Sequence, residues 1–463
     1  MKNFKYHEIQ RYISEGIKSG VFTQKLPSIR CLAQEKSVSI STIQKAYEAL
    51  EFNGEITAKP QKGYFVSHKP GFIRHNYGNS YTQADTKSAL EQQVLYSLND
   101  DKIIPLSSTA PSSVINNESL ITKHHKKSFN SSIYRFQIED EIQGQKLLRQ
   151  NISQLLFRQN TLIDPNNIII STGRREGLLL ALIATECIGR KVAVESPTSF
   201  FFHSTIGQIC QNVIEVPMQS TYESEIELLD QAYREHKFNV YVVNPSFNDP
   251  TGRLLSTSEK LSLLQWAEKR NVTLIEYDRS ELYFGDTKPQ SLAQLSKQTP
   301  NVSLISICDF FDTISTRIYL GYVIAINCRD KLLRVKQTIS EEPSLQTQQL
   351  LNSMISSGDY ENLLVKLRRQ LKTNYLNTVK LLKEELSVDV HFNAVGGGPC
   401  LWLHSPKMQS SKLWQSLIKK QVAIAPGAMF SFKENYENFL RITFALPWNA
   451  DLIIALKKLC KEI

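Results

Sequence analysis

From about residue 106 onward, short β-rich runs alternate with helical patterns, and this alternation restricts the chain to few folds. The runs read NIIIST, KVAVESP, NVIEVP, NVYVVNPS, VTLIEYD, VSLISIC and IYLGYVIAI. The segment GRREGLLLALIATEC, between the first two, has the length and composition of a helix. Strands that are joined through helices form parallel sheets with helices on their faces. The sequence therefore predicts an α/β fold with a mostly parallel sheet.

After residue 340 the pattern changes to one long helix followed by a smaller α+β part. The helix is expected in LLVKLRRQLKTNYLNTVKLLKEEL, and VHFNAVGGGPCLWLH, QVAIAPGAMFSF and FLRITFAL supply short strands and turns. A tight turn is the expected role of the three glycines in GGGPC. We therefore predict a large domain over 106–340 and a C-terminal small subdomain over 341–463.

Residues 1–69 have a pattern of their own: three helices and then a hairpin. Ser28 is a plausible N-cap of the second helix, and ITAKPQKGYFVS has the pattern of two short strands around a turn. Apolar residues at helical spacing define the first helix (Ile9, Tyr12, Ile13, Ile17) and the third (Ile43, Ala46, Tyr47, Leu50). This layout is that of a winged helix-turn-helix.

Positive charge is concentrated in the same segment. The chain has a formal charge of +9, and residues 1–69 hold 11 Lys and Arg against 6 Asp and Glu. Concentrated positive charge favours an anionic partner. The third helix would place its free face in the major groove of DNA, and the hairpin tip would contact backbone phosphates. The residues so placed are Ser41, Thr42, Gln44 and Lys45 on the helix, and Lys59, Lys62 and Gly63 at the tip.

The motif LPSIRxLA…VSxSTIxKAYExLExxGxI…KGYFV, across residues 4–67, resembles the DNA-binding domain of the GntR regulator family. The resemblance implies that Arg30, Ser39, Ser41, Thr42 and Gln44 contact operator DNA. The family often has arginine where this chain has Ile40. Because arginine is the usual reader of guanine, its absence predicts a different operator or more reliance on Gln44, Lys45 and DNA shape. The alternative is a small helical domain that binds protein.

Residues 70–105 are rich in Gly, Asn, Ser, Thr and Gln, and the apolar periodicity lapses until roughly Leu90–Leu98. We interpret this segment as a flexible linker with one short helix near 88–98.

Five motifs occur in the order found in fold-type I pyridoxal-phosphate aminotransferases, over about residues 106–463. They are VESPTSFF, NPSFNDPTG, GGGPCLWL, VAIAPGAMFS and NFLRITFA. A winged helix, a linker and an aminotransferase-like domain together resemble the MocR branch of the GntR family. The resemblance implies a homodimer that forms through the aminotransferase-like domains and presents two basic domains to a double-stranded operator.

The lysine that holds the cofactor in that family is missing. Aligned on Leu-Gly-Tyr, the lysine position is Asp312, and no lysine occurs from Thr299 to Asp330. Asp309 and Phe311 replace phosphate-binding hydroxyls, and Tyr319 replaces an arginine. A lysine is needed for the Schiff base, and a carboxylate normally keeps the pyridine nitrogen protonated. The sequence therefore predicts that the chain carries no cofactor and is not an enzyme.

The remaining candidates define a tentative ligand site. The ring carboxylate of the family maps to Tyr277 or, after a one-residue slip, to Asp278. Arg174 and Arg175 would either compensate a phosphate or pair with Asp309 and Asp312. Arg441 would bind a small anionic effector or form an ion pair inherited with the fold. The predicted ligand-binding set is Arg174, Arg175, Asn248, Tyr277, Asp278, Asp312 and Arg441.

Other features exclude several classes of protein. The seven cysteines are scattered and lack CxxC pairing, which disfavours a zinc site or a disulfide framework and favours seven buried thiols in a cytoplasmic protein. No apolar run has the length of a membrane span. We predict a transcription regulator that binds operator DNA. The alternatives are a regulator that binds pyridoxal phosphate noncovalently, an active aminotransferase and a protein-binding module. The operator, the effector and the sign of regulation are not encoded in any recognisable pattern.

Overall fold

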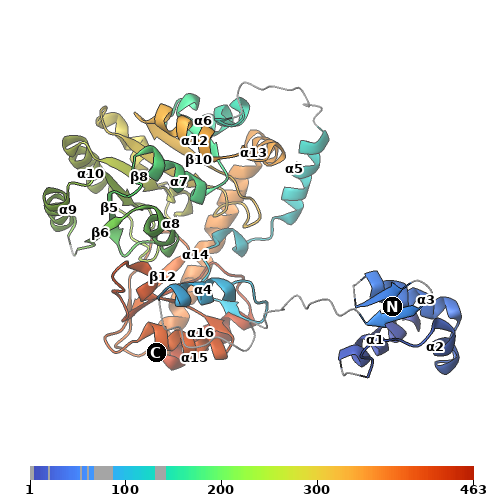
Figure 1. Cartoon of the computed structure of the whole chain (residues 1–463). Coiled ribbons are helices and arrows are strands. Elements are labelled where there is room, and N and C mark those ends of the chain that lie inside the picture. Colours follow the sequence, from blue (N-terminus) through green and yellow to red (C-terminus); the bar gives the residue numbers. More distant parts are fainter. Residues whose placement is uncertain are drawn as a thin grey trace. The chain divides into compact units, whose positions relative to one another are not determined.

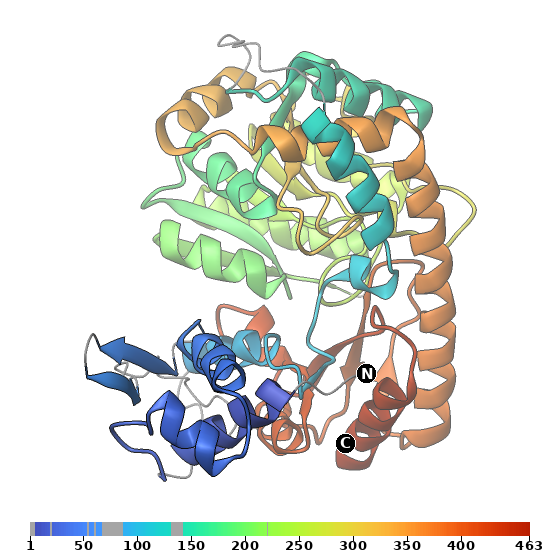
Figure 2. The ribbon, with the colours of Figure 1, turned by 90° about the vertical axis from the view of Figure 1, so that its right-hand side faces the viewer.

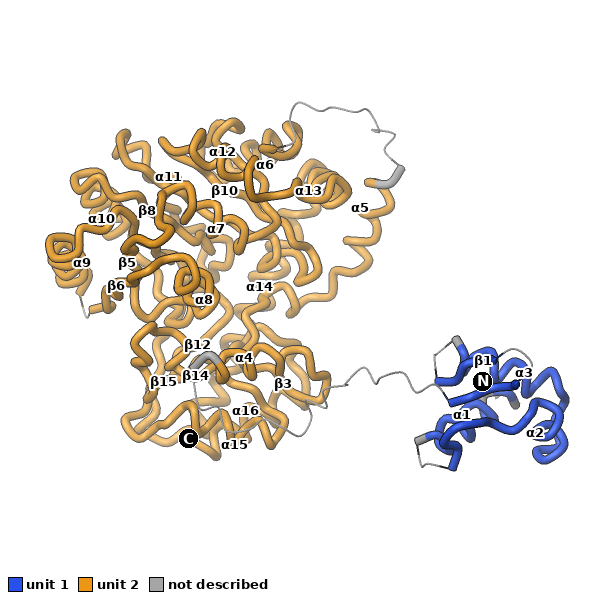
Figure 3. The backbone as a smooth tube through the Cα atoms, in the orientation of Figure 1, with its two compact units in different colours: residues 1–80 blue, residues 81–463 orange. Residues whose placement is uncertain are grey.

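The computed structural model describes residues 5–18, 21–52, 55–59, 62–66, 87–130, 142–219 and 221–463. The chain divides into two compact units, 1–80 and 81–463, which Figure 3 shows in different colours. In the described parts of the chain, no helix combines the length and the apolar character that crossing a bilayer requires.

The N-terminal unit is a winged helix-turn-helix, as predicted. Its elements are α1 (Lys5–Lys18), α2 (Ile29–Glu35), α3 (Ile40–Phe52) and an antiparallel hairpin of β1 (Ile56–Lys59) and β2 (Gly63–Val66). Ser28 caps α2, because its side chain accepts the backbone N–H of Cys31 at 3.2 Å. The predicted apolar face of α3 is fully buried against α1 and α2. The predicted end of this helix, Asn53-Gly54, lies outside the described residues.

The large domain is built on a seven-stranded sheet with the strand order β4-β10-β9-β8-β7-β5-β6. Strands β6, β5, β7, β8 and β9 run parallel, and β10 runs antiparallel to both β9 and β4. The mostly parallel sheet is thus as predicted. The bounds are β4 Ile168–Ser171, β5 Lys191–Ser196, β6 Asn212–Pro217, β7 Val240–Val243, β8 Thr273–Tyr277, β9 Leu304–Asp309 and β10 Gly321–Ile326.

Helices cover both faces of this sheet (Figure 1). Helices α7 (Arg174–Ala184), α8 (Phe200–Ile209) and α12 (Arg329–Ile339) contribute to the core on one face. On the other face lie α6 (Lys146–Arg158), α9 (Tyr222–His236), α10 (Thr257–Arg270), α11 (Leu292–Leu295) and α13 (Leu345–Ser356), with α5 (Glu118–Asn130) against α13. Neighbouring residues of one strand therefore enter opposite cores, which explains why the strands read as continuous apolar runs.

The small subdomain contains a four-stranded antiparallel sheet in the order β11-β12-β15-β14 and a short parallel pair of β13 and β3. Helix α14 (Asp359–Glu385) runs from the large domain along this subdomain (Figure 2, orange). The other elements are α4 Lys87–Ser97, β3 Ile104–Pro105, β11 His391–Phe392, β12 Cys400–His404, α15 Ser410–Lys419, β13 Val422–Ala423, β14 Ala425–Pro426, β15 Phe439–Thr443 and α16 Ala450–Glu462.

Two segments lie elsewhere than their predicted domains. Within the expected linker 70–105, residues 70–86 lie outside the described residues, but α4 and β3 belong to the small subdomain, because Leu90, Val94 and Ile103 are buried in its core. Helix α13 follows residue 340 yet packs in the core of the large sheet. Short amphipathic segments carry no sign of which core they will join, so composition alone misassigned them.

The carboxyl ends of the parallel strands meet at one edge of the large sheet, which is where such folds place their sites. Two glycines allow the backbone to close there. Gly173 adopts φ of 100° immediately before α7. A side chain on Gly321 would meet the backbone oxygen of Cys308 at 2.5 Å. The Leu-Gly-Tyr motif thus reflects the close approach of β10 to β9.

Candidate functional site

In the N-terminal unit, the side chains predicted to contact DNA are solvent-exposed, except for Thr42, which is half-buried. Ser39 caps α3, since its hydroxyl accepts the backbone N–H of Thr42 at 3.2 Å. Gln44 donates its side-chain amide to Glu48 at 3.0 Å, so base reading by Gln44 requires that this bond opens. Ile40, at the position where the family often has arginine, is 52% exposed. The face of α3 opposite its core is therefore free for a partner.

The hairpin carries a cationic cluster that the sequence only partly indicated. Lys59 lies over the ring of Phe65, with its Nζ 4.6 Å from the ring centroid. Lys25, which precedes α2, lies over the same ring at 5.8 Å. Lys62 and Gly63 follow at the exposed turn, where Gly63 has φ of 94°. Lys25 was not predicted as a DNA contact because it is far from the hairpin in the sequence. An isolated β-bridge between Lys25 and Phe65 brings it next to the hairpin.

In the large domain, the position expected for a cofactor lysine lies inside a buried network of charges. The Asp312 carboxylate accepts bonds from Arg174 Nη1 at 3.1 Å, from Arg279 Nε at 3.1 Å and from the Tyr277 hydroxyl at 3.0 Å. Arg174 also donates to the Tyr277 hydroxyl at 3.0 Å. Asp312 and Arg279 are each only 4% exposed. An ionised carboxylate has about four lone-pair sites, and three of those of Asp312 are taken by these donors.

Asp309 closes the same site from the end of β9. Its Oδ2 accepts the backbone N–H of Arg174, the first residue of α7, at 3.2 Å, and lies 3.8 Å from the Arg174 guanidinium. Its Oδ1 accepts the backbone N–H of Phe311 at 2.6 Å. Burial raises the pKa of Asp309 to about 6, although the charge of Arg174 acts in the opposite direction. A helix N-terminus is a natural anion site, and here an internal carboxylate takes it.

A second buried pair lies beside this network. Arg441 Nη1 donates to Asp249 Oδ1 at 2.9 Å, and its Nη2 donates to the backbone carbonyl of Ser107. Ser199 donates to the other oxygen of Asp249 at 2.9 Å. Burial opposes ionisation of Asp249, but the charges of Arg441 and Arg279 outweigh burial and lower its pKa below the usual value. Of the two roles expected for Arg441, the geometry matches the ion pair.

The network therefore joins some predicted residues and omits others. Arg174, Tyr277 and Asp312 come together, and Arg441 lies in the adjacent pair. Asp278 instead accepts the backbone N–H of Ser280 at 2.8 Å. Asn248 accepts from Thr251 of its own loop at 2.8 Å and donates to Glu195 of β5 at 2.8 Å. Arg175 is solvent-exposed, with its guanidinium 5.5 Å from the ring centroid of Phe201.

Besides Asp309, two charged residues of the site were not among the predicted ligand residues. If the family's D-x-Y motif aligns with Tyr277-Asp278-Arg279, Arg279 takes the position of the tyrosine, and Asp249 directly precedes Pro250 in the NPSFNDPTG loop. A signal was present, because each introduces a charge at a motif position that lies at the carboxyl edge of the sheet. In total, three arginines (Arg174, Arg279, Arg441) oppose three carboxylates (Asp249, Asp309, Asp312). Among the described residues, Nη2 of Arg279 and Nε of Arg441 have no hydrogen-bond partner.

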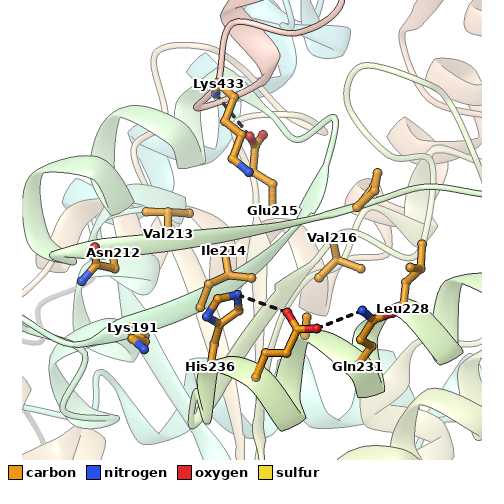
Figure 4. A pocket seen from close by; sticks show the side chains of 13 residues that line it. Lys191, Asn212, Val213, Ile214, Glu215, Val216, Leu228, Gln231, His236 and Lys433 are labelled. Atoms are coloured by element: carbon orange, nitrogen blue, oxygen red, sulfur yellow. Dashed lines mark hydrogen bonds and ion pairs between the residues drawn. The ribbon is translucent and has the colours of Figure 1, made fainter.

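A surface pocket of about 530 Å³ lies away from these charges, between the outer strand β6 and α9 (Figure 4). Lys191, Glu215, Glu235, His236 and Lys433 contribute its titratable groups. None of its lining residues belongs to the network. Among the described residues, no group of three or more His, Cys, Asp or Glu side chains is arranged to hold a metal ion.

The chain matches two family models. Residues 118–459 match the family described as aminotransferase class I and II, and residues 5–66 match the family described as bacterial regulatory proteins, gntR family. Among similar proteins, the HTH-type transcriptional regulator YjiR of Escherichia coli is 26% identical, over 99% of this chain and 98% of its own length. The HTH-type transcriptional regulator NorG of Staphylococcus aureus is 25% identical, over 94% of this chain and 98% of its own length.

Solved structures of aminotransferases share the fold of the second unit. A kynurenine aminotransferase of Pyrococcus horikoshii superposes with a TM-score of 0.71 at 20% identity, covering 81% of this chain and 96% of that one. A multiple substrate aminotransferase of Thermococcus profundus gives 0.73 at 17% identity, covering 84% and 98%. At 20% and 17% identity, these likenesses show the fold alone.

Proposed function

This chain belongs to the aminotransferase class I and II family, and we propose that it regulates transcription without covalent pyridoxal phosphate. It joins its aminotransferase domain to a gntR-family DNA-binding domain, which is the MocR-type architecture of a transcription regulator. In this proposal the aminotransferase-like domain dimerises and positions two DNA-binding units on one operator. It catalyses no transamination.

The observation that carries the proposal is the network around Asp312. Pyridoxal phosphate needs a lysine for its aldehyde and an anion site for its phosphate. Asp312 stands in place of the lysine, and Asp309 already accepts the N–H at the start of α7. A bound phosphate would face both carboxylates, and each like-charge pair at about 4 Å costs roughly 4 kcal/mol at an effective dielectric near 20. The residues present therefore do not fit this cofactor.

The test is to incubate the full-length protein with pyridoxal phosphate, reduce with borohydride and map the modified peptides. We expect unchanged melting temperature, no visible band of a protein-bound aldimine, and only scattered, substoichiometric labelling of surface lysines. No lysine lies between Lys297 and Lys331, so the segment that contains Asp312 serves as an internal blank. One lysine labelled at a full equivalent, with an induced circular dichroism band, would contradict the proposal.

The dimer is tested separately. A dimeric regulator pairs its two DNA-binding units through a symmetric interface, and this interface sets the spacing of the two half-sites on the operator. We expect sedimentation of the full chain as a dimer at micromolar concentration, and a footprint of two half-sites. A monomer that protects a single half-site would refute this part and leave the statement about the cofactor untouched.

A second candidate, sensing of a small anion, is supported by two unpartnered guanidinium nitrogens of the buried charges around Asp312 and Asp249. Nη2 of Arg279 and Nε of Arg441 are buried, and a buried unpaired donor favours a ligand that accepts from it. Thermal shifts with small mono- and dicarboxylates test this idea in the wild type and in Arg279→Met. A carboxylate that stabilises the wild type and not the variant supports sensing; equal shifts in both proteins refute it.

A further inference from the structure

Two cysteines that are distant in sequence lie together behind the large sheet. Cys187 follows the end of α7, and Cys210 is the C-cap of α8. The backbone N–H of Gly189 donates to the carbonyl of Ile209 at 3.2 Å, which ties the two chain segments together. The thiol groups share a side-chain hydrogen bond, and both cysteines are unbridged and buried. The spacing of the two cysteines matches no thiol motif, so the sequence does not indicate this pairing.

The surroundings of the pair distinguish its two sulfurs. The hydrogen bond that the two thiol groups share lowers the pKa of Cys187 below its ordinary value. The hydroxyl of Thr185, 3.4 Å from that sulfur, and the charge of Arg190 act in the same direction. The shared bond and burial raise the pKa of Cys210. Of the two thiols, that of Cys187 therefore loses its proton more readily and forms the thiolate.

Buried cysteines elsewhere in the chain behave in the opposite way. Burial raises the pKa of Cys328 and Cys460 to about 11 and that of Cys400 to about 12. A thiolate is the nucleophilic form of cysteine, and a nearby cation or donor is what makes it accessible. Cys187 thus differs from inert core thiols by its partners and not by its depth.

Small molecules can reach Cys187 from the surface. Cys187 lines a pocket of about 310 Å³ together with Arg190, Lys191 and Lys237 and with Glu186, which pairs with Arg190 at 3.4 Å. Lys191 also lines the neighbouring pocket that Figure 4 shows. Three cations against one carboxylate favour the thiolate, and the pocket is large enough for a peroxide molecule and several waters.

We propose that Cys187 and Cys210 form a reversible disulfide when the protein meets hydrogen peroxide. The Cys187 thiolate attacks one oxygen of the peroxide, the O–O bond breaks, and a sulfenic acid and hydroxide form. The sulfur of Cys210 then displaces the second hydroxide as it loses its proton. The balance is two thiols and one peroxide giving one disulfide and two waters. A dithiol reductant reverses the step by thiol–disulfide exchange.

The position of the pair gives the bond a structural consequence. Helix α7 begins at Arg174, which binds Asp312, and α8 begins next to Ser199, which binds Asp249. The two helices pack against each other. A disulfide would join the far ends of the two helices whose first turns hold the charge network. Disulfides in cytosolic proteins are typically transient and sensory, which matches such a placement.

The experiment uses the full-length protein with Cys31→Ser, because Cys31 is the exposed cysteine of the chain. After treatment with a few equivalents of hydrogen peroxide and blocking of free thiols, trypsin releases Cys187 and Cys210 on separate peptides, because Arg190 and Lys191 lie between them. We expect one cross-linked peptide pair that disappears with dithiothreitol. No such pair, at a peroxide dose that oxidises other thiols, overturns the proposal.

Variants assign the roles of the two sulfurs. In Cys210→Ser, dimedone should trap a sulfenic acid on Cys187, and in Cys187→Ser the thiol of Cys210 should remain unoxidised. Cys328→Ser, another buried cysteine of the same core cluster, is the matched control and should leave the cross-link at its wild-type yield. Equal oxidation of Cys210 with and without Cys187 would overturn the assignment. The cross-link in the protein that retains both cysteines tests the proposal even if a variant folds poorly.

Discussion

Replacement of Arg441 by methionine tests whether this arginine stabilises the fold through its ion pair with Asp249 or serves to bind an anionic ligand. Its side chain is fully buried, and the side chain of its partner Asp249 is 4% exposed. Nη1 of Arg441 lies 2.9 Å from Oδ1 of Asp249. Methionine keeps most of the volume but removes the charge and the bond to the Ser107 carbonyl. Removal of one member of a buried pair leaves an uncompensated charge and typically costs about 3–5 kcal/mol. We expect Arg441→Met to lower the free energy of unfolding by that amount.

The assay is urea unfolding of the full chain, followed by tryptophan fluorescence. Trp402 pairs with Arg441 across β12 and β15, so it reports on the strand that carries the substitution. Arg317→Met is the matched control, because its 3.8 Å pair with Glu118 is exposed on both sides. Exposed pairs contribute roughly 0–1 kcal/mol, so the control should barely move the midpoint.

A cost of less than about 1 kcal/mol for Arg441→Met, equal to that of the surface control, would refute the structural role. A second measurement separates the lost pair from simple misfit. Adding Asp249→Asn to Arg441→Met removes the stranded charge, and groups in direct contact show interaction energies of roughly 0.5–3 kcal/mol. The double variant should therefore be more stable than the sum of the two single changes predicts. Strict additivity would show that the two side chains do not act as a pair.

Three further predictions concern other parts of the chain. Because the folded-state pKa of Asp309 is raised to about 6 from 3.8, the folded protein holds that proton more tightly, and the unfolding free energy should fall by about 2 kcal/mol as pH rises from 4 to 6. Asp309→Asn should abolish this dependence in urea titrations at several pH values; an unchanged slope contradicts it. Lys45→Ala and Lys62→Ala should weaken operator footprints and reduce the salt slope by about one each, with Lys419→Ala as an inert control. Ser28→Ala should destabilise the N-terminal unit by about 0.5–2 kcal/mol in thermal melts, since it removes the cap of α2.

Much of the architecture was predictable because it is written in local periodicity. Helix α3 buries the residues that the spacing of Ile43 and Tyr47 predicted, and the strands of the large sheet fall on the predicted runs. Burial of the cysteines was predicted for all seven and is wrong for Cys31, which is exposed at the start of α2. Cys31 is exposed because α2 is a short helix that buries only Leu32 and Ala33 in the core.

The sequence alone shows that no lysine lies from Thr299 to Asp330, and it predicts that Asp312 takes the position of the family's cofactor lysine. It does not show which side chains surround Asp312. The sequence left open whether Arg174 would hold a ligand or pair with carboxylates, and the fold decides for Asp312. It also recruits Arg279 and Asp249, which sequence spacing did not connect. The physical reason is that periodicity fixes which face of an element is buried. Which side chains bind one another at the carboxyl edge of a parallel sheet is decided only by the tertiary structure, because they follow strands that are far apart in the sequence.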